Sequence, residues 1–78
     1  MRPFPHLETF IAAADRGTFT AAGRALGLTQ AAVSERIHQL EIAVGRPVFC
    51  RGPGRVTLTD AGRTLYEYAR RMQDLTAE

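Results

Sequence analysis

The stretch from Thr18 to Gly45 constrains the fold of this chain more than any other. It opens with a short alanine-rich run, which Gly27 interrupts before a longer amphipathic run begins. The apolar side chains of the second run recur at spacings of four, three and four, which places them on one helical face; they are Val33, Ile37, Leu40 and Val44. We therefore predict a short helix near residues 20–26, packed closely through its alanines, a glycine turn, and a longer helix capped by Thr29. This is a helix-turn-helix.

The exposed face of the longer helix carries short polar groups rather than apolar bulk. Gln30 leads this face, and the residues that follow it there are Ala31, Ser34, Glu35 and His38, with Ile42 the first large apolar side chain. A protruding helix of this kind fits the major groove of B-DNA, which is wide enough to admit it. A helix, a turn and a second helix also occur in many all-α proteins, so the flanking segments decide the interpretation.

Length and composition indicate one small binding unit. A chain of 78 residues has room for a single core and no second module. The sequence contains no signal peptide and no long apolar run, so we expect a cytoplasmic location without membrane contact. Cys50, His6 and His38 follow no metal-binding or nucleophile–base pattern, so we expect no metal, no cofactor and no enzymatic activity.

The segments on either side of the helix-turn-helix complete a mainly α, winged fold. Before it, a helix presents apolar residues along one face as a packing platform: Phe4, Leu7, Phe10, Ile11 and Ala14. After it, two short β-prone runs, 46–51 and 55–58, flank Gly52, Pro53 and Gly54, which is the pattern of a hairpin. A hairpin that follows such a helix is a wing, and it would carry Arg51 and Arg55 to the sugar-phosphate backbone or the minor groove.

Positive charge is concentrated from the helix-turn-helix onwards. Residues 1–23 are neutral, whereas residues 24–71 hold eight arginines against four acidic residues. All ten basic residues are arginine, which can grip phosphate or guanine with paired hydrogen bonds, although a GC-rich genome would produce the same bias. The distribution is that expected of a nucleic-acid-binding face.

A final helix is predicted after Thr59, which is placed as its N-cap, with Asp60 in the positive first turn. Gly62 inside that turn indicates close packing against a neighbouring backbone. The helix has more apolar surface than a terminal helix of a small domain easily buries. We therefore expect a homodimer through this helix, with Leu65, Tyr68, Ala69, Met72 and Leu75 at the interface.

The whole pattern resembles the N-terminal winged helix-turn-helix domain of LysR-type transcriptional regulators. The matching positions run through nearly the entire chain: Leu7, Phe10, Gly17, Thr18, Phe19, Thr20, Ala22, Leu26, Thr29, Gln30, Ala31, Ala32, Val33, Ser34, Ile37, Leu40, Glu41, Gly45, Arg46, Pro47, Val48, Phe49, Arg51, Leu58, Thr59, Asp60, Ala61 and Gly62. The resemblance implies a DNA-binding domain over residues 1–58 and a linker and dimerisation helix over 59–78. It also implies a two-fold dimer that reads an interrupted palindromic site in double-stranded promoter DNA, and a small-molecule effector bound only by a further domain.

Four residues are the candidates for reading bases. Gln30 matches adenine, Ala31 offers a methyl contact to thymine, and Ser34 contacts a base edge or a phosphate. Glu35 stands where many members of the family have arginine. Its carboxylate either accepts from the amine of cytosine or turns aside to pair with a basic neighbour; the three such neighbours are Arg24, Arg36 and His38.

The candidates for the DNA backbone are more numerous. They are Thr18, Thr20, Thr29, Arg36, His38, Arg51 and Arg55. His38 either approaches a phosphate or is simply a solvated side chain. The rival function is a winged helix that binds only proteins, for which Ile42 and Glu35 on the exposed face would be the evidence. Salt-dependent binding to duplex DNA separates the two functions.

Overall fold

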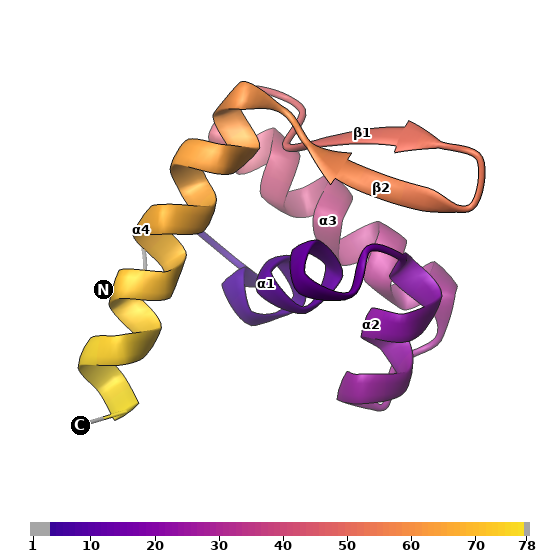
Figure 1. The fold of residues 1–78 in the computed structure, drawn as a ribbon, viewed down its shortest axis with the longest axis horizontal. Helices are drawn as coiled ribbons and strands as arrows, with labels where there is room; N and C mark the ends of the chain where they lie inside the picture. The colour runs from indigo at the N-terminus through magenta and orange to yellow at the C-terminus, as the bar shows by residue number, and fades with distance from the viewer. Residues whose placement is uncertain (1–3, 78) are drawn as a thin grey trace.

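The fold is given by a computed structural model, which describes the backbone of residues 4–77 and the side chains of residues 4–75. Arg2 and Pro3, expected to form an extended lead-in with Phe4 and Pro5, lie outside the described residues. The elements in order are α1 (Leu7–Arg16), α2 (Phe19–Leu26), α3 (Gln30–Val44), β1 (Phe49–Gly52), β2 (Arg55–Leu58) and α4 (Asp60–Ala77) (Figure 1). The predicted winged helix-turn-helix is therefore confirmed.

Threonine hydroxyls begin both helices of the helix-turn-helix. Thr18 accepts from the backbone N–H of Ala21 at 3.0 Å, and Thr29 accepts from that of Ala32 at 3.0 Å. Between the helices Gly27 adopts a left-handed conformation with φ of 71°. Thr29 is thus the predicted cap, and α2 begins one residue earlier than predicted.

The close approach of α2 to the following turn depends on a glycine rather than on the alanines alone. A Cβ at Gly23 would lie 2.4 Å from the carbonyl oxygen of Leu28, so no larger residue fits without a shift. Ala22 is fully buried, whereas Ala25 is exposed. The backbone N–H of Leu28 donates to the carbonyl of Gly23 at 2.8 Å, which ties the turn to the helix at the same point.

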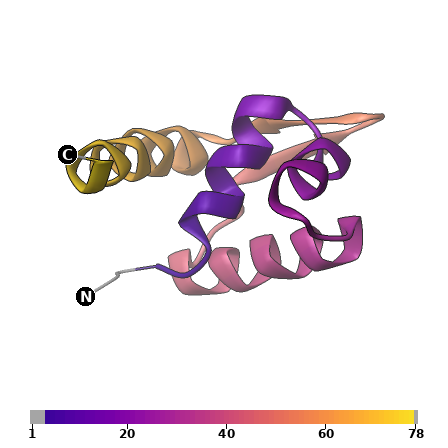
Figure 2. The same cartoon turned by 90° about the horizontal axis from the view of Figure 1, so that it is seen from below.

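Helix α1 lies in the middle of the molecule, between α4 on one side and α2 on the other (Figure 2). Because it is covered on several sides, it buries a wider face than the predicted platform, including Thr9, Ala12 and Ala13. Phe10 is fully buried, and its ring centroid lies 5.4 Å from that of Phe49 at the start of β1. The predicted stripe of α3 completes the core, with Val33, Ile37 and Leu40 fully buried and Val44 half-buried.

The hairpin is antiparallel, with Phe49 paired to Leu58 and Gly52 to Arg55. Besides the packing of Phe49 on the core, hydrogen bonds at two places join it to the helices. The backbone N–H of Val56 donates to the carbonyl of Gly17 at 2.8 Å, which joins β2 to the turn between α1 and α2. The carboxylate of Glu41, from the last turns of α3, accepts from the backbone N–H of Val48 at 2.8 Å just before β1. The wing is therefore held against the helix-turn-helix.

Helix α4 begins as predicted, because the hydroxyl of Thr59 accepts from the backbone N–H of Gly62 at 3.0 Å. The predicted close contact at Gly62 is also confirmed, since a Cβ there would lie 2.1 Å from the carbonyl oxygen of Val48. Farther along, the hydroxyl of Tyr66 donates to the carboxylate of Asp15, which ties α4 to α1.

The apolar residues of α4 divide into two sets, which corrects the expected dimer interface. Leu65 is 6% exposed and Ala69 is 2% exposed, because both pack on the domain's own core. Tyr68 and Leu75 remain 46% and 76% exposed, and Met72 is half-buried. Only these last three, here named the α4 stripe, retain surface for a partner. No helix among the described residues is long and apolar enough to cross a membrane.

Candidate nucleic-acid interface

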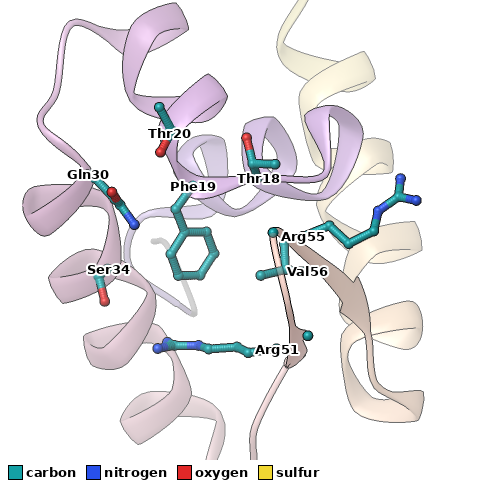
Figure 3. Close-up of a pocket in the computed structure, with 10 residues that line it drawn as sticks. Thr18, Phe19, Thr20, Gln30, Ser34, Arg51, Arg55 and Val56 are labelled. Carbon is teal, nitrogen blue, oxygen red and sulfur yellow. The ribbon is translucent and has the colours of Figure 1, made fainter.

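An open groove separates α3 from the hairpin, and we call it the wing groove. Its volume is about 340 Å³, and its walls include Thr18, Thr20, Gln30, Ser34 and Arg51 (Figure 3). The tip of the hairpin and the N-terminal half of α3 lie at the same end of the molecule, opposite the C-terminal end of α4 (Figures 1 and 2). The groove thus opens where both elements project.

Two of the predicted base-reading residues share the α3 wall of this groove. Gln30 is exposed in the first turn of α3, and Ser34 lies one turn later, half-buried. Figure 3 shows both side chains on the side of α3 that faces the wing. Ala31 is also exposed, but it does not line the groove. The amide of Gln30 offers a donor and an acceptor together, and the hydroxyl of Ser34 can serve as either.

The two wing arginines lie on opposite faces of the hairpin. Arg51 is paired across the strands with Val56, and Arg55 precedes Val56 in the same strand, so alternation along the strand separates them. The guanidinium carbon of Arg51 lies 5.0 Å from the ring centroid of Phe19, a cation–π contact that directs the side chain across the groove towards α3. Arg55 points away from the groove in Figure 3, and its guanidinium lies beside Gly17.

The remaining candidates for the DNA backbone take varied positions. Thr20 is exposed on the groove wall, whereas the hydroxyls of Thr18 and Thr29 are engaged as helix caps. His38 is exposed on α3. Arg36 departs from expectation, because it borders the buried stripe and its guanidinium donates to the hydroxyl of Thr9 at 3.4 Å. It is directed at α1 in this structure, and its expected contact with the DNA backbone stays a prediction.

Glu35 pairs with none of the three basic neighbours suggested by the sequence. Its carboxylate accepts from the side-chain amide of Gln39 at 3.3 Å, one turn farther along α3. The amide oxygen of Gln39 in turn lies 2.7 Å from Nε2 of His6, in the segment before α1. Ile42 lies farther along the same helix and is 68% exposed.

Sequence reasoning missed the part that Phe19 plays in this site. Its ring is 8% exposed, packs against Phe49 at 5.7 Å between centroids, and supports Arg51 on the groove side. An aromatic residue in the first turn of α2 gives no local indication of a partner more than thirty residues away. Among the described residues, no three His, Cys, Asp or Glu side chains are grouped so that they could hold a metal ion.

The family is decided by a model described as "Bacterial regulatory helix-turn-helix protein, lysR family", which matches residues 4–63. The chain belongs to the LysR family. The match runs from the segment before α1 into the first turn of α4 and so includes the whole wing groove.

LysR-family relatives named as transcriptional regulators share this region. PtxR of Pseudomonas aeruginosa is 43% identical over 67 residues, which cover 86% of this chain and 22% of PtxR. LysG of Corynebacterium efficiens, described as a lysine export transcriptional regulatory protein, is 42% identical over 73 residues, which cover 94% of this chain and 25% of LysG. The chain therefore spans about a quarter of the length of these two relatives.

Solved structures of isolated LysR-family DNA-binding domains have the same fold. The BenM DNA-binding domain in complex with benA site 1 DNA superposes with a TM-score of 0.87 at 30% identity, covering 92% of this chain and 81% of that chain. The DNA complex of the CbnR DNA-binding domain gives a TM-score of 0.86 at 32% identity, covering 91% and 82%. Both similar domains were solved with DNA bound.

Proposed function

We propose that this LysR-family domain binds double-stranded DNA sequence-specifically, with the N-terminal half of α3 in the major groove and the hairpin beside it. The observation that carries the proposal is the wing groove, where Gln30 and Ser34 of α3 face Arg51 of the hairpin. A helix that enters the major groove needs exposed, hydrogen-bonding side chains on its leading turns. Two similar domains were solved in complex with DNA, which supports DNA binding by this one.

Base reading is assigned to the outward residues at the start of α3. Gln30 can bond the N6 and N7 atoms of adenine together, Ala31 can contact the methyl group of thymine, and Ser34 can reach a base edge. All three lie within the first two turns of α3, where Gln30 and Ala31 are exposed and Ser34 is half-buried.

Backbone contacts are assigned to the residues around this helix. Arg51 is already held against Phe19, so little of its side-chain entropy remains to be lost when it binds phosphate. Thr20 and His38 are exposed and free to turn towards the backbone, and the N-terminal ends of α2 and α3 present N–H groups beside Thr18 and Thr29. Arg55 faces the other side of the hairpin and is assigned a weaker contact.

We also propose that the domain acts as a homodimer joined through the α4 stripe and reads an interrupted palindromic promoter site. Beside the stripe lies an apolar hollow of about 470 Å³, walled by Phe4, Val44, Ala61 and Tyr68 among others. The hollow shares Tyr68 with the α4 stripe, and Leu75 is exposed farther along the same helix, so α4 offers both a cavity and a side chain to a second copy. Residues 59–78 would then be the dimerisation helix, any effector would be bound by a separate domain, and the regulator would act in the cytoplasm.

The test is a titration of the 78-residue chain against duplexes selected from a random pool and against random duplexes, at several salt concentrations. We expect tighter binding to the selected duplexes and a linear fall of log K with log salt. Gln30→Ala should lose about 1–3 kcal/mol on the selected site only. Arg51→Ala should weaken binding to both duplexes and reduce the salt slope by about one.

Arg71→Ala is the matched control, because it removes the same charge from an exposed position on α4. Equal affinity for selected and random duplexes would refute sequence-specific binding. Binding without salt dependence would refute contact with the DNA backbone, and no binding to any duplex would favour a protein partner.

A further inference from the structure

A hydrogen-bonded chain of three side chains runs from the segment before α1 to the exposed face of α3. Nε2 of His6 lies 2.7 Å from the amide oxygen of Gln39, and the amide nitrogen of Gln39 lies 3.3 Å from a carboxylate oxygen of Glu35. The hydrogen bond between His6 and Gln39 joins residues 33 positions apart in the sequence. A simple solvated pair on one helix would involve only Gln39 and Glu35.

The chemistry of the three groups fixes its direction. An ionised carboxylate only accepts hydrogen bonds, so Gln39 must turn its amide N–H to Glu35 and its oxygen to His6. The imidazole must then donate from Nε2. One oxygen of Glu35 is engaged in this chain, and the other is available to a ligand.

The backbone at His6, the residue just before α1, is left-handed. His6 has φ of 60° and ψ of 33°, and it is the one non-glycine residue with positive φ among residues 4–77. Such a conformation is strained for most side chains, although histidine tolerates it better than most. This backbone conformation places the residue whose imidazole contacts Gln39 at the start of α1.

Glu35 lies outside the wing groove, on the exposed face of α3 that points away from the core. At about 100° per residue, it lies almost opposite the centre of the buried stripe formed by Val33, Ile37 and Leu40. A carboxylate on a DNA-facing surface is repelled by phosphate, so it lowers affinity unless a donor meets it. In the major groove, cytosine presents an amine without a neighbouring acceptor, whereas adenine adds N7, and guanine and thymine present acceptors.

We propose that Glu35 makes α3 select cytosine at one position of the DNA site, and that His6 and Gln39 are positioning residues that hold its carboxylate. This inference rests on the proposed function, since it names the base that one part of the same interface reads. In this role, Glu35 lowers the affinity of the domain for sequences without cytosine at that position and so raises its selectivity.

The experiment is selection of duplexes from a randomised pool by the intact chain and its variants, followed by affinity measurements on four duplexes that differ at the assigned base pair. The unmodified chain should prefer cytosine by about tenfold. Glu35→Gln should transfer the preference at that position to adenine, because a glutamine amide matches N6 and N7. Glu35→Ala should remove the preference and tighten binding to random duplexes.

The positioning residues require variants that keep the carboxylate and the fold. Gln39→Met preserves length without the amide, and His6→Gly removes the imidazole while suiting the left-handed backbone. Each should lower the preference for cytosine by about threefold, the scale of leaving one flexible side chain to be ordered on binding. Melting temperatures should match those of the unmodified chain or, for His6→Gly, exceed them. Glu8→Gln, an exposed acidic residue of α1, is the matched charge control.

The outcomes separate this inference from the proposed function. A chain that selects no sequence overturns both. If Gln30→Ala changes the selected sequence but Glu35→Gln selects the same sequence as the unmodified chain, the role of Glu35 alone is overturned. An unchanged preference in both Gln39→Met and His6→Gly overturns the positioning role.

Discussion

Gly62→Ala should destabilise the domain, although alanine is the better helix former. A Cβ at this position would lie 2.1 Å from the carbonyl oxygen of Val48 and 3.0 Å from Cδ2 of Leu58, where ordinary contact begins at 3.4 Å. The oxygen of Val48 belongs to a backbone and also accepts from the N–H of Thr59 at 3.1 Å. It cannot move away as the end of a flexible side chain would.

The magnitude follows from three terms. Overpacking costs about 1–3 kcal/mol, and loss of the bond from Thr59 to Val48 costs about 1 kcal/mol. Helix propensity returns about 1 kcal/mol on replacing glycine by alanine. The net loss is about 1–3 kcal/mol, and for a domain of this size each kcal/mol lowers the melting temperature by about 4–8 °C.

Thermal and urea unfolding of the chain measure this loss directly. Glu67→Ala is the control, because it places alanine at an exposed position of the same helix and should change stability by less than about 0.5 kcal/mol. A Gly62→Ala chain that melts at or above the temperature of the unmodified chain would show that α4 and the start of the wing are not in close contact.

Three further predictions concern the contacts that join the elements. The hydrogen bond to Asp15, together with partial burial, raises the pKa of Tyr66 above 10.0 in the folded chain. The neutral phenol therefore stabilises the fold below pH 10, and this stabilisation is lost as the pH rises beyond it. The unfolding midpoint of the unmodified chain should thus fall more steeply above pH 10 than that of Tyr66→Phe. Glu41→Ala leaves a buried backbone N–H without its acceptor and should cost about 1–3 kcal/mol in urea unfolding; a cost near zero would mean that water replaces the carboxylate. Leu65→Ala should cost about 2–5 kcal/mol of folding stability, whereas Leu75→Ala should leave the melting temperature unchanged and weaken self-association in sedimentation; the reverse result would move the interface back to Leu65.

Local patterns in the sequence were enough to predict the elements. The caps at Thr29 and Thr59 and the buried stripe of α3 each depend on residues within one or two turns. Close packing at Gly62 was also predictable, because a glycine in the first turn of an amphipathic helix lowers helix stability relative to alanine. These features are local, so the physics that produces them can be seen in a short window of sequence.

Contacts between distant elements were not predictable in the same way. Only the fold brings together the segments that three of the contacts join. These are the hydrogen bonds from His6 through Gln39 to Glu35, the contact of Arg51 with Phe19, and the bond from the backbone of Val48 to Glu41. The apolar spacing along α4 was correct, but spacing alone cannot distinguish a domain's own core from a partner. Leu65 and Ala69 were therefore misassigned.

The hydrogen bond between Tyr66 and Asp15 fixes the N-terminal half of α4 on α1, while the C-terminal half extends beyond the core. Beyond Ala69, the last residue of α4 in the core, the helix continues for about eight residues, or roughly 12 Å at 1.5 Å per residue. A rotation of α4 by about 10° about Ala69 would move its C-terminal end by roughly 2 Å. In a pair of domains joined through this helix, the angle of α4 on its own domain would thus help to set the distance between the two copies of α3.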